Sequence, residues 1–386
     1  MFFGNNPENT ATINRLSSWE VAFLQNLVLS ENILIGATPS DGIPSLSGNH
    51  QGGGMVFGEN DYLFVSTGDS ASANYVNEAI EFGIIDEAYR DLSGIYRSQV
   101  ISQGNGKILR IQGWSGRGVA SNPYYEGGNP YSFKSRLWGY GYRNPFRITY
   151  NPVNKKLIAA DVGAGGHEEV TEIIKDANAG WGKYEGFDNY AGWSENQTNP
   201  DTGLDYDVDY QNPPLLDYGH NGNAETRLLN PNDFSSPFID GNAIEGNSIT
   251  GGIVLENFGE YTGFYMFTDY TKGWINLLSP DGSYTVNFAP EGTVNAAVDI
   301  KQDSNGDVYI VRLFGGIDVI KYDPNLGLTK FAKTIEKGEI FIIYNSLGQM
   351  LRTGVYNDVS DLYSNEIRYI KFPKLNYSSK MILKTK

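Results

Sequence analysis

Short runs of alternating apolar and polar residues, separated by turns rich in Asn, Asp and Gly, recur along most of the chain. Three units share the order strand, turn, strand: residues 55–69, 148–163 and 298–315, and the third continues into another run at 317–322. An apolar period of two is typical of strands that bury one face, and such turns are typical of hairpins. The pattern therefore predicts a series of β-hairpins.

A single hairpin cannot bury both of its faces, but several hairpins packed around an axis can, so the repeat favours a β-propeller. Two long insertions, residues 71–106 and 184–247, are polar, aromatic and Gly-rich, and we expect them on one face of the propeller. Periodicity alone is also compatible with a β-sandwich or a β-solenoid. The 46 Gly and 26 Tyr residues agree with an all-β protein with many turns.

The composition changes after residue 322, where basic residues become frequent and a new series of strand-like runs begins at 338–345 and 350–353. We place a domain boundary within 323–327. The sequence thus predicts a propeller domain over residues 1–325 and a small C-terminal β-sandwich module over residues 330–386.

The formal net charge of −16 argues against nucleic acid or an anionic membrane as a partner. It also disfavours an anionic ligand, unless local cations or a metal balance the charge of that ligand. The absence of cysteine excludes disulfides, thiolate zinc sites and cysteine nucleophiles. No apolar run is long enough to span a bilayer, and residues 1–7 lack the basic and then apolar composition of a signal peptide.

The triplet Arg143-Asn144-Pro145 places a cation and an amide where a strand begins. Proline holds the residue before it in an extended conformation. A guanidinium group can bind a carboxylate or an oxyanion through two parallel hydrogen bonds. A loop fixed by a structural Arg–carboxylate pair would explain the triplet equally well.

The chain has only three histidines, and His50 is the one that lies in a glycine-rich loop directly before a strand. Glycines on both sides let the backbone approach a ligand. An imidazole titrates near neutrality, so His50 is suited to act as a general base. The alternative is a solvated loop histidine without a function, and we interpret His220 as structural.

A second glycine-rich turn, residues 163–166, exposes backbone carbonyls close to Glu168 and Glu169. Carbonyl and carboxylate oxygens are the ligands that calcium prefers, although an ordinary turn has the same composition. The two glutamates are adjacent on an extended chain and face opposite sides, which argues against a glycosidase pair. Signature motifs of serine hydrolases, P-loop NTPases and zincins are missing, and three histidines are too few for a clustered histidine metal site.

Several short segments occur in the same order in one protein family: residues 49–58, 66–69, 106–111, 141–146, 161–163, 168–170, 178–182, 185–186 and 248–252. Over residues 10–322 the chain resembles the soluble pyrroloquinoline-quinone (PQQ)-dependent sugar dehydrogenases of the glucose/sorbosone dehydrogenase family, which are six-bladed β-propellers. Each segment is short, and their order makes the resemblance specific.

The resemblance implies oxidation of a sugar or polyol hydroxyl by hydride transfer to PQQ, with calcium as Lewis acid and an external electron acceptor. By matching position, His50 would be the general base and Arg143 would stabilise negative charge on the quinone. Asn144 would contact the cofactor. The carbonyls of Gly163 and Ala164 would bind the calcium ion.

The family pattern is less complete in the later strands. Thr250 lies in the region of a further cofactor contact. Glucose-oxidising members hold the three cofactor carboxylates with a lysine and two arginines. The matching places here are Thr271, Ala296 and Val298. The nearest cation is Lys272, which we include among the cofactor contacts although its side chain would point the other way on a strand.

Family members carry an export signal and further blades before the region where this chain begins. We therefore expect an N-terminally truncated propeller, with an incomplete ring and an exposed edge. From about residue 330 the tail resembles the C-terminal sorting domain of the type IX secretion system, and residues 343–349 carry that likeness. This implies a secreted, cell-surface or periplasmic protein that meets a secretion machinery through its tail.

Two hypotheses follow. The first is a quinoprotein oxidoreductase, which requires that His50, Arg143 and the turn at Gly163 converge on one site. The second is a non-catalytic secreted propeller that binds carbohydrate or protein through its insertion-rich face. Aromatic residues that could stack on a sugar in either case are Tyr124, Tyr125, Tyr131 and Trp138.

Overall fold

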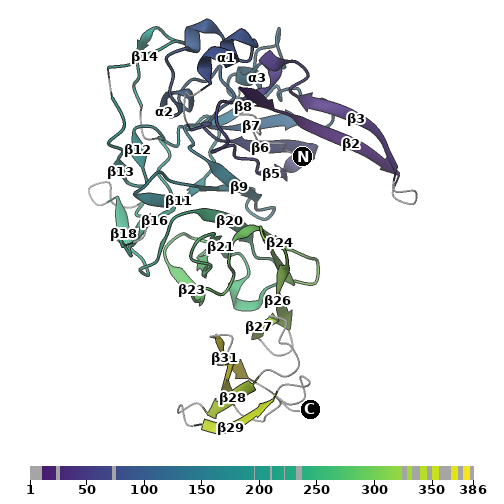
Figure 1. The fold of residues 1–386 in the computed structure, drawn as a ribbon, viewed down its shortest axis with the longest axis vertical. Coiled ribbons are helices and arrows are strands. Elements are labelled where there is room, and N and C mark those ends of the chain that lie inside the picture. Colours follow the sequence, from purple (N-terminus) through teal and green to yellow (C-terminus); the bar gives the residue numbers. More distant parts are fainter. Residues whose placement is uncertain are drawn as a thin grey trace.

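The computed structural model describes the chain except for residues 1–10, 23–26, 72–74, 195, 209–210, 221, 232–236, 324–327, 333–339, 346–349, 356–366, 373–376 and 383–386. Over the described residues the fold consists mostly of antiparallel β-strands (Figure 1). The helices are short: α1 (Val76–Glu81), α2 (Gly94–Arg97), α3 (Phe133–Arg136), and 3-10 turns at Pro39–Asp41, Glu59–Asp61, Glu87–Tyr89 and Gly259–Tyr261.

Two sheets come from the first half of the chain, and in each the strands follow one another in sequence order. The first sheet has the order β5 (Met55–Phe57), β6 (Tyr62–Thr67), β7 (Lys107–Gln112), β8 (Leu137–Tyr140). The second has the order β9 (Pro145–Tyr150), β10 (Leu157–Asp161), β11 (His167–Glu172), β16 (Leu216–His220), β17 (Thr226–Leu229), β18 (Phe238–Asp240), and β19 (Glu245–Gly246) pairs with β16. Each is a meander of the kind that the hairpin pattern predicts.

Two further sheets of four strands follow. The third has the order β20 (Ile249–Val254), β21 (Tyr265–Asp269), β22 (Ile275–Leu278), β23 (Thr285–Ala289). The fourth has the order β24 (Ala297–Gln302), β25 (Val308–Arg312), β26 (Ile317–Asp323), β27 (Leu328–Ala332). Because β27 completes this sheet, the fourth unit extends to residue 332, beyond the end that we predicted at 325.

The first strands of the four sheets lie next to one another, since β9 contacts both β5 and β20, and β20 contacts β24. Close approach depends on glycine at β20. Gly251 has φ +93°, and a Cβ atom there would lie 2.7 Å from Cβ of Arg147. The side chain of Arg147 on β9 passes over this glycine to reach Asp299 on β24, with 3.4 Å between Nε and Oδ1. This arrangement is the radial one of a β-propeller.

Apolar side chains fill the spaces between neighbouring sheets. Phe64 and Ile148 belong to the cluster between the first and second sheets, and Val170 and Phe267 to the cluster between the second and third. A third cluster joins the third and fourth sheets. Burial of each side chain of this size contributes about 1.5–3 kcal/mol to the stability of the fold. Packing between neighbouring sheets therefore holds the four sheets together.

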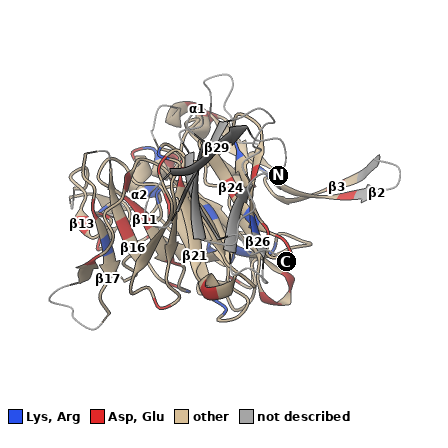
Figure 2. Cartoon of the chain, turned by 90° about the horizontal axis from the view of Figure 1, so that it is seen from below, with Lys and Arg blue, Asp and Glu red and all other residues tan. Residues whose placement is uncertain are grey.

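The N-terminal strands form a projecting hairpin. Strands β2 (Leu16–Ala22) and β3 (Leu27–Ile35) extend away from the body, and Figure 2 shows the same projection from below. Their inner ends pack on the first sheet. Beside them, β1 (Thr12–Asn14) pairs with β4 (Ile43–Ser45).

The two insertions pack against each other. The first carries α1 and α2. The second carries the small hairpins β12 (Tyr184–Glu185) with β13 (Asp188–Asn189), and β14 (Thr198–Asn199) with β15 (Leu204–Asp205). Tyr96 of the first insertion and Tyr206 of the second have ring centroids 5.2 Å apart. Both residues belong to one hydrophobic cluster, which joins the two insertions.

The C-terminal strands form one antiparallel sheet of order β29 (Met350–Val355), β28 (Ile340–Asn345), β30 (Ile367–Phe372), β31 (Tyr377–Ile382). A β-module after the propeller was predicted, and the described strands show a single sheet of it. Residues 346–349 of the sorting-domain likeness lie outside the described residues. Among the helices that the structure describes, none has the length and apolar character needed to cross a membrane.

Candidate functional site

An aspartate stands at or just after the end of the second strand in three of the sheets. Asp161 on β10 accepts the backbone N–H groups of Arg143 (3.0 Å) and Asn144 (2.6 Å), which lead into β9. Asp269 on β21 accepts those of Asn247 (3.0 Å) and Ser248 (2.9 Å), which lead into β20. In both sheets the carboxylate fixes the segment that enters the first strand. Burial raises the pKa of Asp161 to about 7, although the two N–H groups act in the opposite direction.

Asp69 follows β6 at the matching place in the first sheet, and it binds a side chain in place of those N–H groups. Its Oδ1 lies 2.8 Å from Nδ1 of His50, and the side chain of Asp69 is 3% exposed, against 20% for His50. His50 itself has φ +52°, in the left-handed region. The N–H of Ser70 holds the His50 carbonyl at 3.1 Å.

The glycines of this loop are required by close contact. A Cβ atom on Gly68 would lie 2.0 Å from the carbonyl oxygen of His50. Gly52 has φ +67°, and its N–H donates to Oδ1 of Asn144 at 3.0 Å. The glycine-rich sequence therefore lets the His50 loop lie directly on the end of β6 and on the segment that enters β9.

The charge state of Asp69 determines which nitrogen of His50 can act as a base. Burial alone would raise the pKa of Asp69, but the hydrogen bond and charge of His50, the N–H of Ala71 and the charge of Arg143 lower it below its usual value. An ionised carboxylate only accepts hydrogen bonds, so we assign the proton of neutral His50 to Nδ1. The lone pair of Nε2 is then the basic site.

Arg143 is brought to the same place. Its backbone carbonyl accepts the N–H of Asp69 at 2.7 Å. Its guanidinium carbon lies 5.3 Å from the ring centroid of Trp181, and Nη1 donates to the carbonyl of Val162 at 2.8 Å. The indole Nε1 of Trp181 donates to Oδ2 of Asp69 at 2.9 Å. The carboxylate of Asp69 thus joins the imidazole and the indole, and the backbone N–H of Asp69 binds the segment that carries the guanidinium.

The glycine-rich turn next to Val162 is shaped by Glu185. Oε1 of Glu185 accepts four successive N–H groups at 2.6–3.2 Å, those of Ala164, Gly165, Gly166 and His167. Burial would raise the pKa of Glu185, but these N–H groups outweigh burial and lower it. In a trans peptide the carbonyl points opposite to the N–H, so the carbonyls of Gly163 and Ala164 face away from Glu185. They are hard oxygen donors fixed in direction, which suits calcium.

Other predicted contacts have different partners. Thr250 is buried, and its hydroxyl donates to the carbonyl of Ala297 at 2.7 Å, joining β20 to β24. Nζ of Lys272 lies 2.6 Å from Glu245 and 3.6 Å from Glu291. The structure therefore brings His50, Arg143, Asn144 and the turn at Gly163 together, and places Thr250 and Lys272 in separate interactions.

The other two histidines lie on strands of the second sheet. Nε2 of His220 is 2.8 Å from Glu168, whose second oxygen accepts the N–H of Ile249. His167 binds Glu225 at 2.8 Å. The described residues contain no cluster of three or more His, Asp or Glu side chains that could hold a metal ion.

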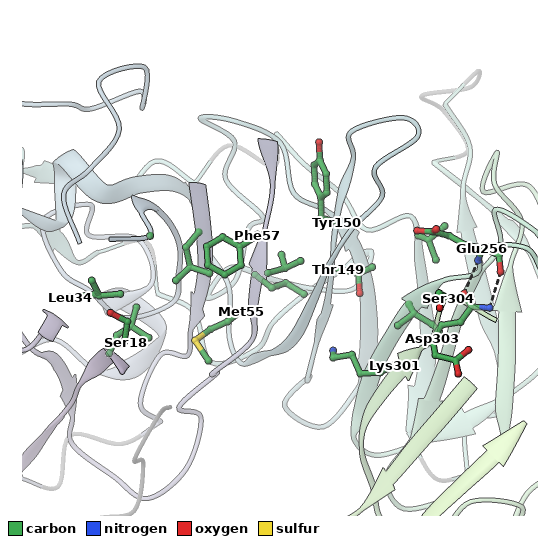
Figure 3. Close-up of a pocket in the computed structure, with 18 of the residues that line it drawn as sticks. Ser18, Leu34, Met55, Phe57, Thr149, Tyr150, Glu256, Lys301, Asp303 and Ser304 are labelled. Carbon is green, nitrogen blue, oxygen red and sulfur yellow. Dashed lines mark hydrogen bonds between the residues drawn. The ribbon is translucent and has the colours of Figure 1, made fainter. Parts of the chain in front are cut away.

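A cavity of about 680 Å³ opens at the opposite ends of the same first strands (Figure 3). Its walls include Met55 and Phe57 of β5, Thr149 and Tyr150 of β9, and Lys301 of β24. His50 and Arg143 do not line it. The cavity and the candidate site are therefore different features of the molecule.

Sequence reasoning did not assign roles to Asp69, Trp181 and Glu185. All three lie in the short ordered segments that carry the family resemblance. Those segments were the only signal for them, because a buried acid or indole has no local pattern of its own.

The glucose/sorbosone dehydrogenase family model matches residues 8–214, which is more than half of the chain, and the chain belongs to that family. The match ends before the third and fourth sheets.

Curated relatives include the HIPL2 protein of Arabidopsis thaliana, 26% identical over 258 residues, or 64% of this chain and 32% of that protein. Quinoprotein glucose dehydrogenase B of Acinetobacter calcoaceticus is 26% identical over 159 residues, 40% of this chain and 30% of that protein. The chain spans about a third of the length of these relatives.

Among solved structures, a glucose dehydrogenase crystal structure has a TM-score of 0.53 at 14% identity, covering 81% of this chain and 73% of that one. The soluble aldose sugar dehydrogenase of Escherichia coli in the apo-form has a TM-score of 0.50 at 15% identity, covering 80% and 73%. These matches concern the fold. They support the mostly-β, propeller-like architecture that the repeat predicts.

Proposed function

We propose that this protein is a quinoprotein oxidoreductase that oxidises a sugar or polyol hydroxyl, with PQQ and calcium as cofactors and an external electron acceptor. The observation that carries the proposal is the joining of His50 and Arg143 through Asp69. Family membership supports an oxidoreductase acting on sugars. A relative is named as a quinoprotein glucose dehydrogenase, which supports the choice of PQQ.

The residues fit this cofactor pair in their chemistry. The carbonyls of Gly163 and Ala164 are hard donors for calcium, and Arg143 is a cation beside them, held through Val162. Asn144 can donate to a cofactor oxygen through its amide nitrogen, since its Oδ1 accepts from Gly52. When bound, PQQ would accept the hydride and calcium would act as a Lewis acid.

His50 and Arg143 would have complementary roles in this reaction. Nε2 of His50 takes the proton of the substrate hydroxyl, while Asp69 holds Nδ1–H and stabilises the imidazolium that forms. The guanidinium of Arg143 would stabilise the negative charge that develops on the quinone, and its contacts with Val162 and Trp181 would hold it in place for that role. General-base catalysis of this kind typically contributes about 100- to 10,000-fold in rate.

A non-catalytic binding propeller is the second candidate. One observation favours it: the positive charge of Lys272 is already balanced by Glu245 and Glu291, so a cofactor carboxylate there would meet two carboxylates as well as the lysine. Of the aromatic side chains expected to stack on a sugar in a lectin-like role, Tyr131 and Trp138 differ in their exposure. Tyr131 is 48% exposed, whereas the ring of Trp138 is covered by the guanidinium of Arg110 at 4.6 Å.

The complete assembly is also part of the proposal. We infer the six-bladed propeller fold of the family, to which the four sheets described would belong. The basic C-terminal sheet would serve as a sorting module for type IX secretion, and the protein would act at the cell surface, in the periplasm or outside the cell.

The deciding experiment is reconstitution of the full-length protein with PQQ and calcium, followed by dye reduction over a panel of aldoses and polyols. We expect turnover that needs both cofactors, and a rise in melting temperature on their addition. His50→Ala should lower kcat by about 100-fold or more and leave the cofactor-dependent rise in melting temperature in place. No dye reduction and no thermal shift with the unmodified protein would favour the binding propeller.

A further inference from the structure

Trp181 contacts both halves of the candidate site. Its indole Nε1 donates to Oδ2 of Asp69 at 2.9 Å, while the other oxygen of that carboxylate binds His50. The guanidinium carbon of Arg143 lies 5.3 Å from the centre of its ring. No other described side chain has a hydrogen bond to Asp69 together with a ring contact to Arg143.

The position of Trp181 is fixed from several sides. The side chain is 5% exposed, and the ring of Tyr190 lies 4.8 Å away at an interplanar angle of 42°. Its backbone N–H donates to the carbonyl of Gly141 at 2.9 Å. Its carbonyl accepts from Ser98 at 2.9 Å and Gln99 at 2.6 Å. A ring held this firmly can hold a carboxylate and a guanidinium in a constant relation.

The hydrogen bond from the indole also selects the orientation of Asp69. A carboxylate with only His50 and a backbone N–H on Oδ1 could rotate about its last bond and reorient its oxygens. With Oδ2 bound to a neutral donor, Oδ1 stays aimed at Nδ1 of His50. The Nδ1–H tautomer, which leaves Nε2 basic, is thereby favoured.

We propose that Trp181 is a positioning residue that sets the tautomer of His50 through Asp69 and the place of Arg143 through its ring face. This inference rests on the proposed function for its catalytic meaning, but its physical content concerns the protein alone. A purely structural tryptophan would stabilise the fold without affecting the His50 ring.

The chain offers a matched control for that distinction. Trp274 is 6% exposed, and its Nε1 donates to a backbone carbonyl, that of Glu245, at 2.8 Å. Trp181→Phe and Trp274→Phe therefore remove one buried indole hydrogen bond each, at similar burial. Only the first of the two bonds ends on Asp69.

The test is nitrogen-15 NMR of the histidine side chains in the full chain without cofactor, which reports the tautomer of each ring. With three histidines, His50 is assigned by the loss of its signals in His50→Ala. We expect Trp181→Phe to shift the His50 tautomer ratio away from Nδ1–H by roughly fivefold, the factor that one hydrogen bond typically supplies. Trp274→Phe should leave the ratio as it is in the unmodified protein.

A second variant covers the case in which Trp181→Phe does not fold. Site-specific replacement of Trp181 by benzothienylalanine keeps the size of the ring and removes only the N–H donor. The proposal is overturned if the His50 ratio is unchanged in the folded variant, or if Trp274→Phe shifts it equally. The proposal is supported if the Trp181 variants shift the His50 tautomer ratio and Trp274→Phe does not.

Activity gives a separate readout. In the reconstituted enzyme, Trp181→Phe should lower kcat by about tenfold or more while KM changes by less than about threefold. If the unmodified protein shows no turnover with PQQ and calcium, the proposed function fails. The tautomer measurement still decides the role of Trp181 in that case.

Discussion

Asp69 binds the imidazole of His50 at the place where Asp161, in the next sheet, binds the backbone N–H groups of Arg143 and Asn144. The same architectural position therefore serves two purposes. In the second sheet the carboxylate only fixes the chain that enters the first strand. In the first sheet it fixes a side chain that can exchange a proton, and this difference converts a structural repeat into a candidate reaction centre.

Asp69→Asn should damage catalysis more than stability. The amide has one acceptor oxygen in place of two, so it cannot accept from both His50 and Trp181 with the same geometry. We expect kcat to fall by about 100-fold or more in the dye-reduction assay. Asp281→Asn, in a remote turn where Asp281 binds only Ser279 and Ser283, is the control. Equal kcat values for the two variants would rule out a positioning role for Asp69.

Gly68→Ala should disrupt the His50 loop. The added Cβ would lie 2.0 Å from the His50 carbonyl oxygen, an impossible contact that only a backbone shift can relieve. We expect the free energy of unfolding to fall by about 3 kcal/mol, measured by denaturant titration. Gly127→Ala is the control, because a Cβ atom at Gly127 would have no atom within 4 Å. It should change the free energy of unfolding by less than about 0.5 kcal/mol. A neutral Gly68→Ala would mean that the loop can move freely.

Glu185→Gln should weaken calcium binding. The carboxylate holds the four N–H groups that direct the carbonyls of Gly163 and Ala164, and a neutral amide holds them less strongly. Calorimetric titration should show about a tenfold loss of calcium affinity, which is typical of residues that orient metal ligands. Glu172→Gln, whose side chain pairs with Lys156, should bind calcium as the unmodified protein does. Unchanged affinity in Glu185→Gln would place the metal elsewhere.

The His220–Glu168 pair should make stability depend on pH. Burial would lower the pKa of His220, but the hydrogen bond and charge of Glu168 raise it above 6.5. Burial also raises the pKa of Glu168, against the effect of His220. Both raised values favour the protonated forms in the folded state, so the stabilisation is present at low pH and lost as pH rises through the folded values.

His220→Gln tests this expectation by comparison with the unmodified protein. At pH near 5 the variant loses the hydrogen bond between the imidazolium of His220 and Glu168, which should cost about 2 kcal/mol, and the difference should shrink toward pH 8. Denaturant titrations across that range measure it, with Glu168→Gln as the reciprocal variant. A difference that is constant with pH would show that the pair does not titrate in this range.

Local patterns predicted much of this architecture. The three strand–turn–strand units correspond to β5 with β6, β9 with β10, and β24 with β25. The glycine-rich segments around His50 and Gly163 are close-contact turns. These features were accessible because alternation, turn residues and glycine act over a few neighbouring positions.

Long-range partners were beyond such patterns. Asp69 and Trp181 are 112 positions apart, and nothing near either residue indicates their hydrogen bond. The predicted cofactor contact Lys272 lies beside Glu245 because of how β19 and the turn after β21 are placed. The extension of the fourth sheet to β27 depends in the same way on pairing with β26.

The sequence by itself determined the hairpins, their turns and the three groups with suitable chemistry: an imidazole, a guanidinium and a carbonyl-rich turn. The tertiary structure alone decided that Asp69 joins the first two, that Glu185 directs the third, and that Thr250 and Lys272 have other partners. The reason is physical: alternation and turns depend on adjacent residues, whereas a shared carboxylate depends on the packing of separate sheets, which fixes where distant side chains meet.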